Sequence, residues 1–159
     1  MYLDVDFEVY KPFDDLLNYS AFAGYEGSKH SPVMMGVIAS VPKGEWVTEQ
    51  MGYYANRHFI INGKTDLTTN VTFVTNKMCE HGFINNGKEQ EYKDLHIFPV
   101  DYFCPRLTTG EYVKSENTYC EHKGLISTWA KRSLKHKILK LFPMAFRTKM
   151  IKMKRTIVG

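Results

Sequence analysis

The stretch YLDVDFEVYKPFDDLL, residues 2–17, places two acidic residues inside an otherwise apolar run. We predict a strand over residues 1–9 that stops before Pro12. Side chains at i and i+2 of a strand lie on one face, so Asp4 and Asp6 are expected side by side. Two neighbouring carboxylates repel each other, and burial adds the cost of removing them from water. The pair therefore needs either solvent or a counter-ion.

Two interpretations of this pair remain open from its spacing. Carboxylate oxygens are ligands that Mg²⁺ and Mn²⁺ accept, and such an ion can take phosphate oxygens at its remaining positions. Alternatively, the strand has one solvent-facing side and the two acids bind no metal, because Asp-x-Asp also occurs by chance.

The composition of the chain is that of one globular domain. Its 159 residues are 43% hydrophobic and 14% aromatic. The sequence has neither a run of 18 apolar residues nor a basic and then apolar start, which argues against a transmembrane helix and a signal peptide and favours the cytoplasm. Three widely spaced cysteines without a C-x-x-C motif argue against a disulfide framework and a zinc site. We predict that Cys79, Cys104 and Cys120 are buried free thiols.

Strand and helix patterns alternate after the first strand, which predicts an α/β fold. Residues 13–17 are expected to form a helical turn capped by Asp14 or Asp15. Residues 83–94 are expected to form a polar loop. Further strands are predicted at 20–26, 31–41 (a central strand), 95–105 and 116–123, and helices after Pro42 and over 70–82 with Asn70 as cap.

Four segments resemble glycosyltransferase family 32, the sugar transferases with a DXD motif, which include capsular-polysaccharide transferases and initiating mannosyltransferases. These segments are residues 2–17, SAFAGYE (20–26), IFPVDYFCP (97–105) and NTYCEHKGLISTW (117–129). The resemblance covers about residues 1–130. It implies a GT-A-like fold, that is, a Rossmann-like mixed sheet with flanking helices. It also implies retaining transfer from a nucleotide-sugar donor.

The resemblance also implies roles for individual residues. Asp4 and Asp6 would hold Mn²⁺ or Mg²⁺ against the donor diphosphate, with His122 as a metal or phosphate contact. Glu26 would face the sugar or the acceptor, and no catalytic base is assigned. His122 as an ordinary loop histidine and Glu26 as a solvated strand end remain open alternatives. The remaining donor contacts implied are Tyr2, Ser127 and Trp129.

The resemblance begins at Met1, whereas members of the family carry a nucleotide-binding region before this point. We therefore expect residues 1–130 to correspond to the C-terminal part of the transferase domain. Residues 1–159 alone are expected to bind nucleotides poorly.

The charge of the chain is divided at residue 131. Residues 1–130 hold 11 Lys and Arg against 17 Asp and Glu, whereas residues 131–159 hold 10 Lys and Arg and no acid. Apolar residues at helical spacing predict a basic amphipathic tail, which suits an anionic membrane surface. The alternative is a solvated helix packed through its apolar side; nucleic acid is not expected as a partner. The membrane-facing cations would include Lys131, Arg132, Lys135, Lys137 and Lys140.

These observations lead to one functional hypothesis and two alternatives. The hypothesis is a metal-dependent glycosyltransferase of surface or capsular polysaccharide biosynthesis, acting on a polysaccharide or lipid-linked acceptor at the inner face of the cytoplasmic membrane. The alternatives are a non-catalytic remnant or accessory domain, and a basic module that binds membrane surfaces.

Overall fold

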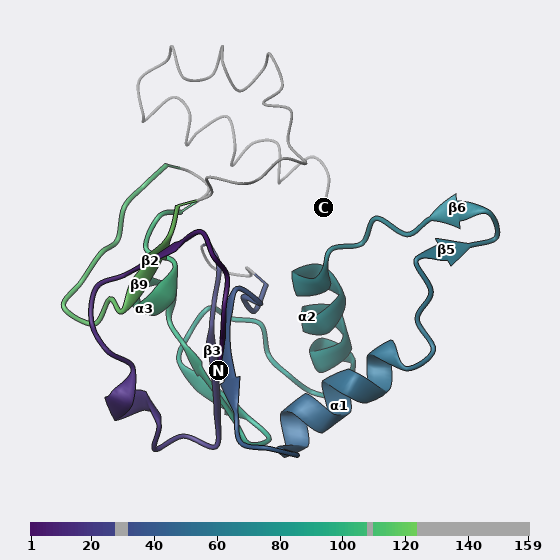
Figure 1. The fold of residues 1–159 in the computed structure, drawn as a ribbon, viewed down its shortest axis with the longest axis horizontal. Helices are drawn as coiled ribbons and strands as arrows, with labels where there is room; N and C mark the ends of the chain where they lie inside the picture. Colours follow the sequence, from purple (N-terminus) through teal and green to yellow (C-terminus); the bar gives the residue numbers. More distant parts are fainter. Residues whose placement is uncertain (28–31, 108–109, 124–159) are drawn as a thin grey trace, which may run out of the picture.

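A computed structural model describes residues 1–27, 32–107 and 110–123 (Figure 1). Its helical elements are the 3-10 turn η1 (Asp14–Leu16), α1 (Glu45–Tyr54), α2 (Asn70–Glu80) and α3 (Val100–Phe103). Its strands are β1 (Tyr2–Leu3), β2 (Phe7–Val9), β3 (Ala21–Gly24), β4 (Val37–Ser40), β5 (Ile60–Ile61), β6 (Lys64–Thr65), β7 (Gln90–Tyr92), β8 (Leu95–Phe98) and β9 (Cys120–His122).

The main sheet has five strands in the order β1-β4-β3-β8-β7. Strands β3 and β8 are parallel, and the other neighbours in this sheet are antiparallel. Strands β1, β3 and β8 therefore run in the same direction and end at the same edge. The predicted α/β class is confirmed as a mixed sheet with few helices.

The sheet separates two apolar cores because successive strand residues point to opposite faces. On one face, α1 and α2 add Trp46, Val74 and Met78 to Ala23 of β3. On the other face, η1, α3 and β9 pack against Phe22 of the same strand. Figure 1 shows α1 and α2 on one side of the sheet and α3, β2 and β9 on the other.

The predicted strand over residues 1–9 is wrong in its middle. After β1, the Phe7 backbone N–H donates to the Asp4 carbonyl at 3.2 Å, which closes a turn around Val5. Strand β2 then leaves the main sheet and pairs with β9. Asp4 precedes this turn and Asp6 lies in it. The two acids therefore do not share a strand face as predicted, because the two halves of the segment pair with two different strands.

The predictions for the middle of the chain are confirmed in part. Residues 20–26 and 31–41 contain β3 and β4, and β4 lies between β1 and β3. The helices after Pro42 and over 70–82 are α1 and α2. The α2 cap, however, is Thr69, whose hydroxyl accepts from the Thr72 N–H at 3.4 Å. Turn η1 has no side-chain cap, so the expected capping by Asp14 or Asp15 is wrong.

The later segments contain more regular structure than expected. The expected polar loop over 83–94 contains β7, and residues 95–105 form β8 followed by α3. The hairpin of β5 and β6 was not predicted. Cys104 and Cys120 are buried free thiols, as expected, whereas Cys79 is free but exposed.

Within the described ranges, every helix is too short or too polar to cross a bilayer.

Candidate functional site

The candidate site lies at the edge where β1, β3 and β8 end. Asp4 directly follows β1, and Glu26 stands two residues after β3. In open α/β sheets, ligands bind outside the carboxyl ends of the parallel strands. Asp6 lies in the turn that follows Asp4. Three acids selected from the sequence, Asp4, Asp6 and Glu26, are therefore at this edge.

The pairing of β2 with β9 brings His122 to Asp6. Phe7 stands opposite His122 in this ladder, and their rings stack with centroids 4.9 Å apart. His122 Nε2 hydrogen-bonds Asp6 Oδ2 at 3.0 Å. The Lys123 backbone N–H also donates to the Asp6 carbonyl at 2.9 Å. Two residues 116 positions apart, both selected from the sequence, are thus in direct contact.

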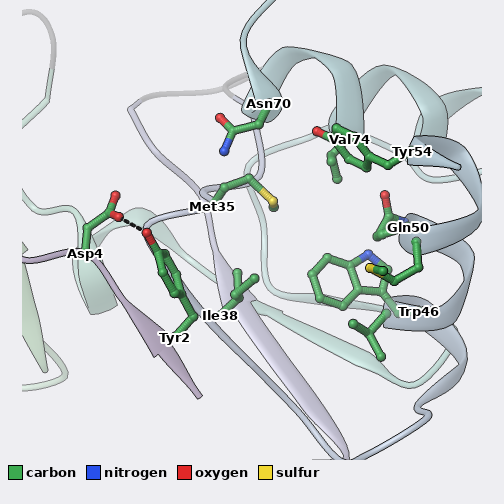
Figure 2. A pocket seen from close by; sticks show the side chains of 11 residues that line it. Tyr2, Asp4, Met35, Ile38, Trp46, Gln50, Tyr54, Asn70 and Val74 are labelled. Carbon is green, nitrogen blue, oxygen red and sulfur yellow. Dashed lines mark hydrogen bonds between the residues drawn. The ribbon is translucent and has the colours of Figure 1, made fainter. Parts of the chain in front are cut away.

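Asp4 is held by different partners. Its backbone N–H donates to the Gly36 carbonyl at 2.9 Å, and its carboxylate accepts a hydrogen bond from the Tyr2 hydroxyl (Figure 2). That hydrogen bond and the carboxylate charge raise the pKa of Tyr2. A Cβ at Gly36 would lie 3.1 Å from Asp4 Oδ2 and 2.8 Å from the Phe7 ring, so only glycine leaves room for both side chains here.

Glu26 is a half-buried residue close to the same cluster. Burial raises the pKa of Glu26, and the charge of His122 opposes this rise. Burial also raises the pKa of the Cys104 thiol to about 11, with a further contribution from Glu26. Glu26 is therefore close enough to both residues to interact with them electrostatically.

The described residues include no group of three or more His, Cys, Asp or Glu side chains already arranged around one point as metal ligands. The pair of Asp6 and His122 is the part of the expected set that the structure brings together, whereas Asp4 is engaged by Tyr2. The expected donor contacts Ser127 and Trp129 lie outside the described residues. So do the expected membrane contacts Lys131, Arg132, Lys135, Lys137 and Lys140.

One residue of this region was not selected from the sequence. Glu121, next to His122 in β9, is only 1% exposed, and both its oxygens are hydrogen-bonded. Arg106 Nε donates to Oε1 at 2.8 Å, while the hydroxyls of Tyr10 and Tyr112 donate to Oε2 at 2.6 and 2.8 Å. The sequence feature that could have identified Glu121 is an acid next to Cys120 within a predicted strand. This network fixes β9, and so fixes His122.

Comparisons with family models, with curated proteins and with solved structures find no match to this chain.

Proposed function

We propose that this chain is part of a metal-dependent glycosyltransferase of the GT-A type that transfers a sugar, with retention, from a nucleotide-sugar donor. The observation that carries the proposal is the contact between Asp6 and His122 at the carboxyl edge of the parallel strands. The family resemblance of residues 1–130 supports it. We further propose surface or capsular polysaccharide synthesis as the setting, with a polysaccharide or lipid-linked acceptor.

The donor atoms of this edge fit a hard divalent cation. The Asp6 carboxylate and the His122 imidazole are already within 3.0 Å of each other, and both are ligands that Mn²⁺ accepts. Asp4 would join them by exchanging its hydrogen bond with Tyr2 for the ion. When bound, Mn²⁺ or Mg²⁺ supplies positive charge to the leaving diphosphate.

The reaction breaks the bond between the anomeric carbon and the diphosphate oxygen, and that electron pair leaves with the nucleoside diphosphate. The acceptor oxygen forms the new bond to the anomeric carbon, and its proton passes to the departing phosphate. Asp4 and Asp6 would hold the cation that offsets the negative charge of the diphosphate. Glu26, which interacts electrostatically with His122, would face the sugar or the acceptor, where its carboxyl group can hydrogen-bond a sugar hydroxyl.

Titration of Mn²⁺ into the full chain, followed by NMR, tests the metal site. Bound Mn²⁺ broadens the signals of nearby nuclei, so we expect selective loss of the signals of residues 4–7 and His122. Asp6→Asn should weaken this binding at least about tenfold, which corresponds to about 1.4 kcal/mol. Asp14→Asn is the matched control, because Asp14 is an exposed acid in the same N-terminal segment.

The same titration with UDP or GDP present tests the donor. Because residues 1–159 alone are expected to bind nucleotides poorly, the nucleotide is supplied at high concentration. We expect one of the two to tighten Mn²⁺ binding in the wild-type chain and not in Asp6→Asn. Equal broadening in wild type and Asp6→Asn, with or without nucleotide, would remove the metal site. The accessory-domain and membrane-module interpretations would then be preferred.

A further inference from the structure

The hydrogen bond to Asp6 restrains only one atom of the His122 imidazole. Pairing of β2 with β9 fixes the backbone of His122, but the ring can still turn about the torsions of its side chain. The side chain of His122 is 39% exposed, so solvent does not hold the ring in one place. A ring that presents one nitrogen to a fixed point therefore requires a second contact that sets its plane.

Phe7 supplies this second contact. It stands directly opposite His122 in the ladder of β2 and β9, where side chains of the two strands lie within reach of each other. The two rings stack with their centroids 4.9 Å apart and an angle of 23° between their planes. The phenyl ring thus covers one face of the imidazole and sets the plane in which the imidazole lies.

The phenyl ring is itself held at Gly36, the residue immediately before β4. A Cβ at this position would lie 2.8 Å from Phe7 Cε2 and 3.0 Å from Phe7 Cζ. Both distances are shorter than the usual contact of about 3.5–4.0 Å between carbon atoms, so the ring occupies space that a side chain would fill. Phe7 also packs against the apolar core on the side of η1 and α3. Its ring therefore has one edge toward Gly36 and one face toward His122.

Gly36 is also a contact of Asp4. The Gly36 carbonyl accepts a hydrogen bond from the Asp4 backbone N–H at 2.9 Å, and a Cβ at Gly36 would lie 3.1 Å from Asp4 Oδ2. One backbone position thus sets the place of the Asp4 carboxylate directly and the place of the His122 imidazole through Phe7.

We propose that Phe7 is a positioning residue that orients the His122 imidazole toward Asp6, and that Gly36 holds Phe7 in this orientation. The orientation exists without metal, but its consequence for metal affinity rests on the proposed function. Groups that orient a metal ligand without touching the metal typically change metal affinity by about 10–100-fold.

NMR spectra of the full chain without metal test the orientation. The ring current of Phe7 should shift the carbon-bound ring protons of His122 upfield, and these signals are assigned by their loss in His122→Ala. Gly36→Ala keeps the phenyl ring but displaces it, so the His122 signals should move toward those of a free histidine. Phe13→Leu is the matched control, because it removes a ring that packs on the same core, and it should leave the signals in place.

The hydrogen bond itself is followed through the nitrogen signal of His122 Nε2. Phe7→Leu should shift this signal, whereas Phe13→Leu should not. This measurement keeps the test decisive if Gly36→Ala does not fold, which urea unfolding establishes for each variant. The proposal is overturned if the His122 signals of folded Phe7→Leu show the same Nε2 environment as the wild type.

Titration of Mn²⁺ into the same variants tests the consequence for the metal. Phe7→Leu should weaken Mn²⁺ binding about tenfold. In a His122→Ala background the same change should have almost no further effect, because Phe7 acts through the imidazole. Equal losses in both backgrounds would show that Phe7 only stabilises the fold, and would overturn its positioning role.

The two kinds of measurement separate this proposal from the proposed function. Suppose that the His122 signals respond to Phe7→Leu and Gly36→Ala, but the wild type gives no Mn²⁺ response. The orientation of the imidazole by Phe7 is then upheld and the metal site is removed. A Mn²⁺ response that Asp6→Asn weakens, together with His122 signals that neither variant changes, would overturn the positioning role alone.

Discussion

At the scale of single residues, Glu121 is a charged side chain buried inside the protein. A carboxylate with 1% exposure is tolerated because Tyr10, Tyr112 and Arg106 surround its oxygens with donors. Burial by itself would raise the pKa of Glu121, but these hydrogen bonds and the Arg106 charge lower it to about 2. The folded state therefore holds the ionised form, and the network holds β9 against β2 next to His122.

Glu121→Gln should reduce the free energy of unfolding by about 1–3 kcal/mol at neutral pH, because it leaves Arg106 and the tyrosine hydroxyls poorly paired. The wild-type contribution is present above the ordinary carboxyl pKa of 4.5 and is lost as the pH falls toward 2. The difference between wild type and variant should therefore shrink in acid.

Urea unfolding of both proteins between neutral pH and about pH 3 measures this difference. Glu116→Gln, a change at an exposed glutamate in the segment before β9, serves as the control and should have little effect. A stability difference that stays constant over the whole pH range would show that the Glu121 charge is not the stabilising element.

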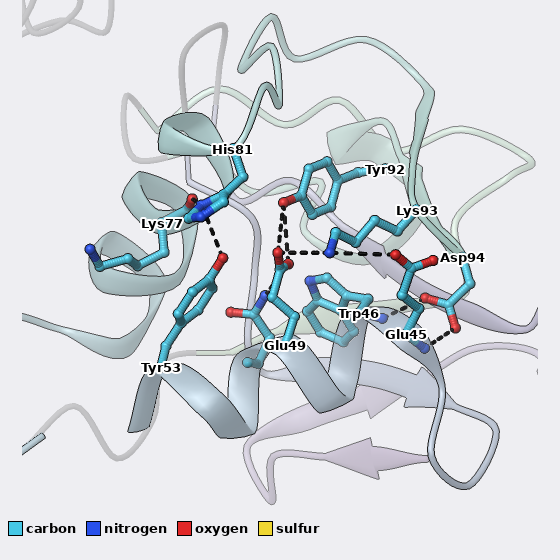
Figure 3. A network of polar contacts seen from close by, with 10 residues as sticks. Glu45, Trp46, Glu49, Tyr53, Lys77, His81, Tyr92, Lys93 and Asp94 are labelled. Carbon is cyan, nitrogen blue, oxygen red and sulfur yellow. Dashed lines mark hydrogen bonds and ion pairs between the residues drawn. The ribbon is translucent and has the colours of Figure 1, made fainter. Parts of the chain in front are cut away.

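At the scale of elements, the turn between β7 and β8 holds the start of α1 (Figure 3). Helix α1 has Gly44 at its cap position and no side-chain cap of its own. Asp94 supplies one from this turn by accepting the N–H groups of Glu45 and Trp46 at 2.8 and 2.7 Å. Lys93, from the same turn, pairs with Glu49 at 2.8 Å. The turn thus positions the helix that packs Trp46 into the core against the main sheet.

Asp94→Ala should lower the free energy of unfolding by about 0.5–2 kcal/mol, the usual cost of losing a helix cap. Asp94→Asn keeps an oxygen acceptor and should lose less. Urea unfolding measures both, with Asp14→Ala as a control because η1 has no side-chain cap. Equal stability of wild type and Asp94→Ala would mean that backbone N–H groups of α1 are satisfied by solvent.

At the scale of the whole molecule, the main feature is the separation of charge along the chain. The tail from residue 131 carries 10 basic residues and no acid, whereas the preceding 130 residues have more acids than bases. Each Lys or Arg near an anionic bilayer contributes about 1 kcal/mol of attraction. We therefore propose that the tail brings the domain to anionic membranes, where a lipid-linked acceptor would be found.

Co-sedimentation with vesicles should show binding to anionic and not to neutral lipid. Binding should weaken steeply with salt, since the Debye length falls from about 10 Å at 0.1 M to about 3 Å at 1 M. Replacement by Gln of three tail lysines should weaken it further. The three are Lys135, Lys137 and Lys140.

A matched triple variant outside the tail provides the control. It replaces three exposed lysines of the main domain by Gln and should bind almost as the wild type does. These are Lys43, Lys64 and Lys88. If both triple variants bind equally, net charge and not the tail is responsible, and a folded wild type that ignores anionic vesicles removes the membrane proposal.

Patterns of neighbouring residues predicted the strands and helices whose formation depends mainly on short-range sequence. Continuous apolar runs predicted β3 and β4, and helical spacing predicted α1 and α2. The Asn62-Gly63 turn, with φ of 51° and 73°, was a readable hairpin signal that was missed. Strand β7 had no such signal, because its turn uses Lys93 at φ 55° and Asp94, which also caps α1.

By itself, the sequence determined the α/β class, most of the inner strands and the residues Asp4, Asp6, Glu26 and His122 as a set worth testing. Only the tertiary structure decided that the first strand breaks at Asp4, that His122 contacts Asp6, and that the half-buried Glu26 lies near His122. The reason is that pairing between β2 and β9 joins segments more than a hundred residues apart. Such pairing leaves no periodic pattern in either segment, so its consequences appear only when the chain is folded.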